Sequence, residues 1–278
     1  MIPHYMTLQR SIDLVVSTFH RYAALVHTER WQGVDISAKP DMATWELLDY
    51  SVRAQLEGQE DLEHYRSVIR PSIPWADDHF DERVSGKPLN PGEQWKKWPW
   101  AQSAKNFLDD SIFSHTYMER YWPRYANKPL IAPIPEQEEH QGIRHRYGDL
   151  LDLVQLLYNE PYTRQAYFPV WFPEDTGAHN ATRKPCTLGY WFVIRDGKLN
   201  VTYYIRSCDL MRHFRDDIYL TIRLMLWLLD QCRLKALVNG SLVVNEFWQP
   251  LKPGAFTMHI GSLHCFRNDW IALYGERR

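Results

Sequence analysis

The residues with the clearest chemical potential lie between positions 183 and 221. Cys186 follows a proline and precedes a run of β-branched and aromatic residues. An Arg-Ser pair begins at Arg206, and Asp216 and Asp217 stand before an apolar segment. A thiolate is a strong nucleophile, and a neighbouring cation lowers the pKa of a thiol. This grouping predicts an active site, whereas a cysteine that merely begins a strand is usually inert packing.

A hairpin and a helix are needed to bring these residues together. Thr187–Arg195 has the composition of a strand, Asp196-Gly197 is a strong two-residue turn signal, and Lys198–Arg206 resumes the strand pattern. Apolar residues then recur at helical spacing up to about Cys232. The pattern places Cys186 at the mouth of the hairpin, the Arg-Ser pair at its far end and the two aspartates at the start of the helix.

This constellation resembles the centre of thymidylate synthase, and most closely the phage deoxycytidylate hydroxymethylase branch of that superfamily. Cys186-Thr187 matches the Cys-Thr of this branch, and residues Arg206 to Asp217 match its run Arg-Ser-x-Asp-x-x-x-x-Phe-Arg-x-Asp. Gly261-Ser-Leu-His264 is a second matching island, and the resemblance is dense after about Tyr147. It implies an α/β fold with a large mixed sheet, flanking helices and a sheet-to-sheet homodimer.

The resemblance implies nucleophilic catalysis on a pyrimidine, whose C5 atom is a poor nucleophile until the Cys186 thiolate adds to C6. A glutamate of the family organises water and protons around the ring. Glu63, in the setting Leu62-Glu-His-Tyr65, matches it, although a surface helix glutamate is the other reading. Tyr117 matches the active-site tyrosine, although Met118 stands where the family has glycine.

A second set of residues matches the phosphate contacts of the family. Arg30 stands where a phosphate-binding cation follows the first helix, but it could equally be a solvated surface arginine. Arg206 and Ser207 match phosphate ligands on the hairpin. In the family, two arginines reach across the dimer to the partner's phosphate. Arg164 and Gln165 occupy these positions, so one charge–charge contact is replaced by a weaker hydrogen bond.

The base and the sugar are read by residues that differ from those of thymidylate synthase. Asp217 stands where that enzyme has asparagine, and a carboxylate accepts the C4 amino group of cytosine, so cytidylate is predicted over uridylate. The adjacent Asp216 is the alternative, as a helix cap. His264 matches the histidine on the sugar 3′-hydroxyl. Phe266 replaces the tyrosine that assists it, which leaves ribose open as the sugar.

The resemblance implies 5,10-methylenetetrahydrofolate as the cofactor. Asp209 matches the aspartate that contacts the folate ring. Several tryptophans of a proline-rich stretch could stack on a flat ring or belong to the core. These are Trp95, Trp98 and Trp100, with Trp98 taken as the cofactor-binding candidate.

Bulk properties bound the remaining possibilities. The 278 residues are predicted to form one domain, residues 1–278, with an inserted loop over residues 123–142. A formal net charge of −2 argues against a general nucleic-acid binder. The four cysteines show no C-x-x-C spacing, which indicates neither a zinc site nor a disulfide framework. No apolar run suits a membrane span and no signal peptide is recognised, so a cytoplasmic location is expected.

Periodicity predicts the elements outside the hairpin. Three helices are expected over Leu8–His27, Asp61–Ile69 and Tyr147–Tyr158, and three strands over Ala43–Leu56, Ser241–Glu246 and Phe256–Ile260. Within the first of these strands, Glu46-Leu-Leu could also be helical.

The predicted activity is transfer of a one-carbon unit from the folate to C5 of a cytosine nucleotide, completed by water to give a 5-hydroxymethyl product. Only a dozen residues follow Phe266, and their charged end is unlike the apolar lid that excludes water in thymidylate synthase. The alternatives are reductive methylation of a cytosine or uracil nucleotide, and a catalytically inactive nucleotide-binding homologue.

Overall fold

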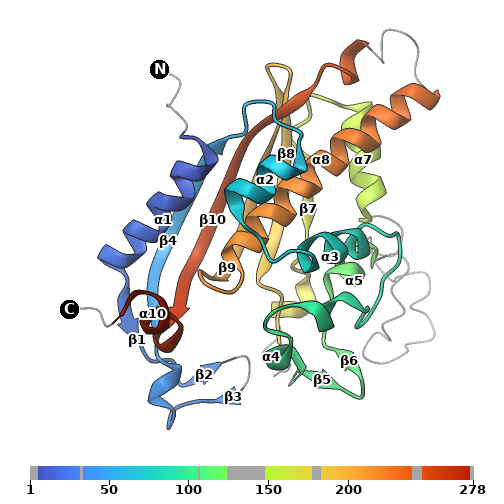
Figure 1. The fold of residues 1–278 in the computed structure, drawn as a ribbon. Helices are drawn as coiled ribbons and strands as arrows, with labels where there is room; N and C mark the ends of the chain where they lie inside the picture. Colours follow the sequence, from blue (N-terminus) through green and yellow to red (C-terminus); the bar gives the residue numbers. More distant parts are fainter. Residues whose placement is uncertain are drawn as a thin grey trace.

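A six-stranded mixed sheet organises the protein (Figure 1). The computed structural model describes residues 6–31, 34–105, 107–123, 148–176, 183–239 and 246–275. Along the sheet, β10 and β9 run parallel and all other neighbours are antiparallel. In spatial order the strands are β1 (Ala24–Val26), β4 (Thr44–Gln55), β10 (Lys252–Phe266), β9 (Lys198–Asp209), β8 (Thr187–Arg195) and β7 (Tyr167–Pro169).

Helices flank this sheet, and the longest crosses β9 and β10 (Figure 1). The α1 helix packs on β4, and α7 packs on α8. The predicted α/β architecture with a large mixed sheet and flanking helices is therefore confirmed. These helices are α1 (Leu8–Tyr22), α2 (Leu62–Ile69), α7 (Leu150–Asn159), α8 (Phe214–Asn239) and α10 (Arg267–Tyr274).

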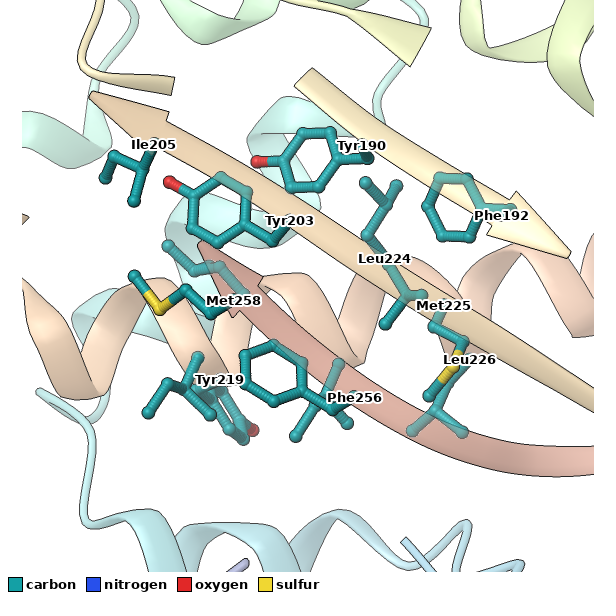
Figure 2. Close-up of a cluster of buried hydrophobic side chains, with 14 of the residues drawn as sticks. Tyr190, Phe192, Tyr203, Ile205, Tyr219, Leu224, Met225, Leu226, Phe256 and Met258 are labelled. Atoms are coloured by element: carbon teal, nitrogen blue, oxygen red, sulfur yellow. The ribbon is translucent and has the colours of Figure 1, made fainter. Parts of the chain in front are cut away.

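The main core lies between the sheet and α8 (Figure 2). Alternate residues of three strands point toward α8, because successive side chains of a strand face opposite sides. Full burial of each such side chain contributes about 1.5–3 kcal/mol. The strand residues labelled in Figure 2 are Tyr190 and Phe192 on β8, Tyr203 and Ile205 on β9, and Phe256 and Met258 on β10; Tyr219, Leu224, Met225 and Leu226 come from α8.

The opposite face of the sheet carries more polar and partly exposed residues. Tyr204 stacks on His259 with ring centroids 5.3 Å apart, and the His259 ring lies 2.8 Å from the Ser51 hydroxyl. Tyr167, next to Tyr204, is 44% exposed. This face is the one that the predicted sheet-to-sheet homodimer would use, and the dimer itself stays a prediction.

A group of short elements lies beside the ends of β8 and β9 (Figure 1). It includes α3 and α5, which contact each other, and α3 also packs on α8. The elements are α3 (Trp75–Arg83), η2 (Gln94–Lys97), α4 (Ala101–Lys105), β5 (Leu108–Asp109), β6 (Ile112–Phe113) and α5 (Tyr117–Tyr121). A two-stranded ribbon of β2 (Arg30–Trp31) and β3 (Val34–Asp35) lies near the N-terminal end of β4 (Figure 1). Two single turns, η1 (Pro40–Met42) and η5 (Pro173–Thr176), are also present.

Most predicted elements agree with the structure, with differences at their ends. The turn at Asp196-Gly197 has positive φ at both residues, 52° and 66°, as a two-residue hairpin turn requires. The first helix stops at Tyr22 rather than His27, because Ala24–Val26 pairs with β4 instead. The central helix continues to Asn239, well past Cys232.

Two predictions concern parts of the chain that the structure describes only in small part. The expected inserted loop, 123–142, lies outside the described residues except for its first residue. The expected strand Ser241–Glu246 lies outside them except for Glu246, which is helical. Within the described ranges, no helix has the length and apolar character that would be needed to cross a membrane.

Candidate active site

Cys186 lies where two pockets meet. The larger, with a volume of about 440 Å³, is called the outer pocket, and the smaller, with about 140 Å³, is called the inner pocket. Trp98, Arg183, Ser207 and His213 line both pockets together with Cys186, whose thiol is free. A ligand that occupies both pockets would therefore pass beside the thiol.

Strand pairing explains how Cys186 meets the residues of the neighbouring strands. The N–H of Arg206 donates to the carbonyl of Cys186 at 2.9 Å, which closes the hairpin. On the other side of β9, β10 runs parallel and brings His264 into register with Asp209. The two backbones approach closely at Gly261, where an added Cβ would lie 2.8 Å from the Arg206 carbonyl oxygen. Glycine at position 261 is thus required for the close approach of the two segments that carry the resemblance, Arg206–Asp217 and Gly261–His264.

Cations concentrate around the outer pocket, which Arg30, Arg183, Lys184 and Arg206 all line. The Arg206 side chain donates to the backbone carbonyls of Pro185 at 2.9 Å and Lys184 at 3.1 Å, and so fixes the segment before the cysteine. The Lys184 ammonium nitrogen is buried and makes no hydrogen bond with the described residues. A buried cation among other cations favours an anionic ligand, because such a ligand supplies the missing partner.

Polar groups for orienting a ligand lie on the same pocket. Asp209 accepts the backbone N–H groups of Met211 at 2.9 Å and Arg212 at 3.0 Å. The Ser207 hydroxyl lies 3.4 Å from Nδ1 of His264. Burial raises the pKa of Asp209, and the charges of His264 and Arg212 oppose this rise. The predicted residues Ser207, Asp209 and His264 are therefore assembled on one wall.

Asp217 lines the inner pocket from the first turn of α8. Its carboxylate accepts a long hydrogen bond from the Cys208 thiol, 3.6 Å. Burial raises the pKa of Asp217 to about 7, the positive charge of Arg83 opposes the rise, and the neighbouring Asp216 adds to it. Asp216 has a separate role, since its carboxylate accepts both the N–H and the hydroxyl of Ser72, at 2.7 and 3.0 Å.

Tyr117 lines the inner pocket from the start of α5. Its hydroxyl lies 3.0 Å from the Thr187 hydroxyl, which in turn lies 2.8 Å from the Tyr203 hydroxyl. Burial raises the pKa of Tyr117 to about 12, so the phenol stays protonated at neutral pH. Met118, in place of the family's glycine, is buried. The Thr187 that follows the cysteine thus positions the predicted tyrosine.

The thiol of Cys186 responds to opposing effects. Burial is the largest and raises its pKa, the charges of Arg206 and Arg183 lower it, and Asp217 and Asp209 raise it further. The pKa is therefore raised on balance. Arg206, as the neighbouring cation, acts in the expected direction, but desolvation of the thiolate outweighs its attraction.

Aromatic residues form the remaining walls. Trp98 stacks on His213 with ring centroids 4.6 Å apart and an interplanar angle of 21°. Burial lowers the pKa of His213 to about 3, so this imidazole is neutral at neutral pH. Trp31 meets Phe107 and Phe266 edge-on at 5.5 and 5.7 Å beside the outer pocket. These flat surfaces suit a planar ligand.

Three predicted residues do not line either pocket. Glu63, predicted to organise water and protons around the ring, is 74% exposed in its side chain and pairs with Arg66 on the same helix, outside the lining of both pockets. Arg164 and Gln165 are exposed, and the Arg164 carbonyl accepts the Trp191 indole N–H at 3.0 Å. Their predicted contact with a second copy of the chain stays a prediction.

Several pocket residues were missed by sequence reasoning. Arg183 and Lys184 precede the Pro-Cys pair, and their charge beside a candidate nucleophile was an available signal. His213 stands within the matched run but at one of its variable positions. Glu46 and Arg83 also line the pockets, and no sequence pattern marked them as pocket residues.

The chain is similar in sequence to known proteins. A profile of the thymidylate synthase family matches residues 74–239. Thymidylate synthase from Rhodopseudomonas palustris is 26% identical over 184 residues, which cover 63% of this chain and 54% of that protein. Deoxyuridylate hydroxymethyltransferase from Bacillus phage SP01 is 26% identical over 175 residues, covering 61% of this chain and 38% of that protein. The chain thus spans about half, or less, of the length of these relatives.

A solved structure gives the same fold over nearly the whole chain. Thermostable thymidylate synthase A from Bacillus subtilis superposes with a TM-score of 0.60 at 15% identity. The superposition covers 96% of this chain and 82% of that one.

Proposed function

Since the chain belongs to the thymidylate synthase family, we propose that it transfers a one-carbon unit to C5 of a pyrimidine nucleotide. The position of Cys186, between a cation-rich outer pocket and a small inner pocket, is the observation that carries this proposal. The thiolate adds to C6 of the base, Tyr117 and Asp217 contact the ring, and the cations of the outer pocket bind the phosphate.

The outer pocket also suits a folate. Its aromatic walls, which include Trp98, fit a planar ring, Asp209 offers a carboxylate acceptor, and the surrounding cations fit a glutamate tail. When bound, 5,10-methylenetetrahydrofolate would supply the one-carbon unit at the oxidation level of formaldehyde. The chain itself would hold the nucleotide, supply the thiolate and position the proton donors.

A cytosine nucleotide, such as deoxycytidylate, is the proposed substrate. The support is Asp217, an acidic side chain in the inner pocket, because a carboxylate accepts from the C4 amino group of cytosine. Reading of a uracil nucleotide is the alternative, since the phage relative is described as a deoxyuridylate enzyme. Phe266 lines the outer pocket without a hydroxyl, so the sugar is left open between ribose and deoxyribose.

The proposed product is the 5-hydroxymethyl nucleotide, which requires water to reach the one-carbon unit. The described residues after Phe266 form α10, whose Trp270 packs against Phe19 of α1 rather than lining either pocket. The described part of this segment therefore does not cover either pocket, which supports access of water to the one-carbon unit, whereas an inserted loop acting as the lid would favour methylation. Reductive methylation and a non-catalytic nucleotide-binding role are the alternatives.

One experiment separates these possibilities. The protein is incubated with methylenetetrahydrofolate and, in turn, dCMP, CMP, dUMP and UMP, and products are identified by mass. The expected product is a hydroxymethylcytosine nucleotide with no rise at 340 nm from dihydrofolate. A methylated product with a matching absorbance rise would favour reductive methylation, and binding without any product would favour the non-catalytic role.

A further inference from the structure

Arg83, the last residue of α3, is a buried cation on the wall of the inner pocket. It is only 5% exposed. Its Nε donates to Nε2 of His79 at 2.9 Å, and its guanidinium lies over the Tyr117 ring at 4.0 Å. Among the described residues, no hydrogen bond or ion pair engages its two terminal nitrogens. Buried guanidinium groups are costly unless paired, so these unused N–H groups point to an acceptor on the ligand.

A chain of side chains holds Arg83 in this position. Because Nε2 of His79 accepts from Arg83, the proton of the neutral imidazole lies on Nδ1, which is 3.7 Å from Oε2 of Glu82. Trp75 stacks on the same imidazole at 4.9 Å and 14°. Burial and the Arg83 charge lower the pKa of His79 to about 4, which keeps the ring neutral at neutral pH. The guanidinium is therefore fixed before any ligand arrives.

The chemistry proposed for Cys186 creates negative charge next to this cation. When the thiolate adds, the S–C6 bond forms, the C5–C6 double bond opens, and its electron pair spreads over C5 and onto the heteroatoms of the base. No oxidant or reductant takes part in this step. A fixed cation with free N–H groups beside the base lowers the energy of such a charge-delocalised intermediate.

Resting on the proposed function, we infer that Arg83 is a catalytic residue whose guanidinium contacts the pyrimidine and stabilises the negative charge formed when Cys186 adds to C6. Asp217, on the same pocket, would then accept from the base while Arg83 donates to it. The two residues give the inner pocket one acceptor and one cationic donor for reading the ring edge.

The addition step can be measured alone, without folate. Reversible addition at C6 allows C5 to take up a deuteron from D₂O, so the C5 hydrogen of the nucleotide exchanges and mass spectrometry follows it. For the nucleotide that the wild-type protein exchanges best, Arg83→Gln is expected to slow exchange by ~10²–10³-fold. The nucleotide Kd is expected to rise by less than about tenfold, because the charge develops only after binding.

Arg233→Gln is the matched control. Arg233 is also a largely buried arginine, with 14% of its side chain exposed, but it pairs with Glu60 and does not line either pocket. Its replacement should leave the exchange rate of the folded protein unchanged. If Arg83→Gln fails to fold, Arg83→Met, which keeps an unbranched side chain without the charge, repeats the measurement.

The outcomes are distinct. If the wild-type protein exchanges the C5 hydrogen and a folded Arg83 variant does so equally fast, the role of Arg83 is overturned while the proposed function stands. An equal loss in affinity and in exchange rate would also overturn it, because it would mark a binding residue only. Absence of exchange by the wild-type protein with all four nucleotides would instead overturn the proposed function, and the inference with it.

Discussion

At the scale of single residues, the proposed chemistry depends on the thiol of Cys186. Cys186→Ser is expected to reduce turnover by at least ~10²-fold while leaving the nucleotide Kd nearly unchanged, because a hydroxyl is a much poorer nucleophile than a thiolate. Product formation and calorimetric titration measure the two quantities. Cys232→Ser, a buried thiol away from both pockets, is the control. Turnover of more than a few per cent in Cys186→Ser would remove this residue from the nucleophile role.

The carboxylate of Asp217 is expected to decide which base is preferred. Asp217→Asn removes a charged acceptor and adds a donor, so preference should move from cytosine toward uracil nucleotides. The expected change is ~1–3 kcal/mol, or roughly tenfold to a hundredfold in relative kcat/KM. Competition between dCMP and dUMP measures it directly. An unchanged preference would contradict the assignment of the cytosine amino group to Asp217.

The same residue makes stability depend on pH. Its pKa is raised from 3.8 to about 7 by burial, so between these values the folded state holds a proton that the unfolded state has lost. The free energy of unfolding therefore falls as pH rises through this window, by up to ~1.4 kcal/mol per pH unit. Asp217→Asn should remove this contribution and gain stability relative to wild type from pH 5 to 7. Urea denaturation at several pH values measures the free energy of unfolding of both proteins. The same pH dependence in both would disprove the prediction.

The hairpin residues could be predicted from the local pattern alone, whereas pocket residues on other elements, such as Tyr117 and His264, were predicted only through the resemblance. Cys186, Arg206 and Ser207 come together because strand pairing is local and its turn is marked by Asp196-Gly197. Arg83 reaches the same pocket from α3. Its arrival depends on how a distant helix packs, and periodicity holds no information on that contact.

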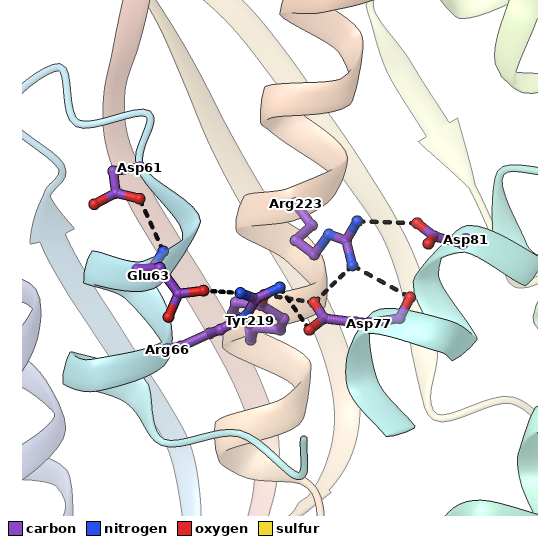
Figure 3. Close-up of polar contacts among 7 residues, drawn as sticks. All are labelled: Asp61, Glu63, Arg66, Asp77, Asp81, Tyr219 and Arg223. Carbon is purple, nitrogen blue, oxygen red and sulfur yellow. Dashed lines mark hydrogen bonds and ion pairs between the residues drawn. The ribbon is translucent and has the colours of Figure 1, made fainter. Parts of the chain in front are cut away.

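At the scale of elements, ion pairs tie α2 and α3 to the central helix α8 (Figure 3). Asp77 of α3 accepts from Arg66 of α2 at 2.7 Å, and from Tyr219 and Arg223 of α8 at 2.7 and 2.8 Å. Glu63 contacts only the outer side of this group, through Arg66 (Figure 3). The network therefore helps to position α3, from which the inner pocket receives part of its wall.

Asp77 should matter far more for stability than its neighbour Asp81. The Asp77 side chain is 18% exposed and has three partners, whereas that of Asp81 is 71% exposed and pairs only with Arg223 among the described residues. Asp77→Ala is expected to lower the free energy of unfolding by ~1–3 kcal/mol, because it leaves partly buried cations unpaired. Asp81→Ala should cost less than ~0.5 kcal/mol. Equal effects in urea denaturation would show that the network does not hold α3.

The ends of elements were harder to predict than their existence. The apolar pattern of the first helix continues to Val26, yet the helix stops at Tyr22 because residues 24–26 pair with β4. A non-local backbone pairing here replaces local helix propensity. The strand over Ala43–Leu56 was predicted nearly to its ends, because alternation is regular from Tyr50 to Gln55, although it is interrupted at Leu48 and Asp49, where Asp49 has a φ of 53°.

At the scale of the whole molecule, the open face of the sheet and the exposed Arg164 both bear on whether a second copy of the chain completes the phosphate site. Arg164 lies outside both pockets of its own chain, so a phosphate role requires a second copy. Within one chain, Arg183 and Lys184 already supply cations that the resemblance did not imply. The phosphate site is thus either completed by a partner or sufficient alone, and the two cases differ in what mixing of inactive variants yields.

Complementation between two inactive variants shows whether the partner subunit completes the phosphate site or one chain is sufficient. If Arg164 serves the partner's site across an isologous interface, a mixed dimer of Arg164→Ala and Cys186→Ser contains one site with both residues intact. Each variant alone is expected to be inactive, and mixing after subunit exchange should restore up to about a quarter of wild-type activity, since half of random dimers are mixed and each has one active site. Size-exclusion chromatography with light scattering verifies the dimer. An Arg164→Ala protein that is fully active, or mixed dimers without activity, would show that Arg164 does not act in trans and that the cations of one chain hold the phosphate.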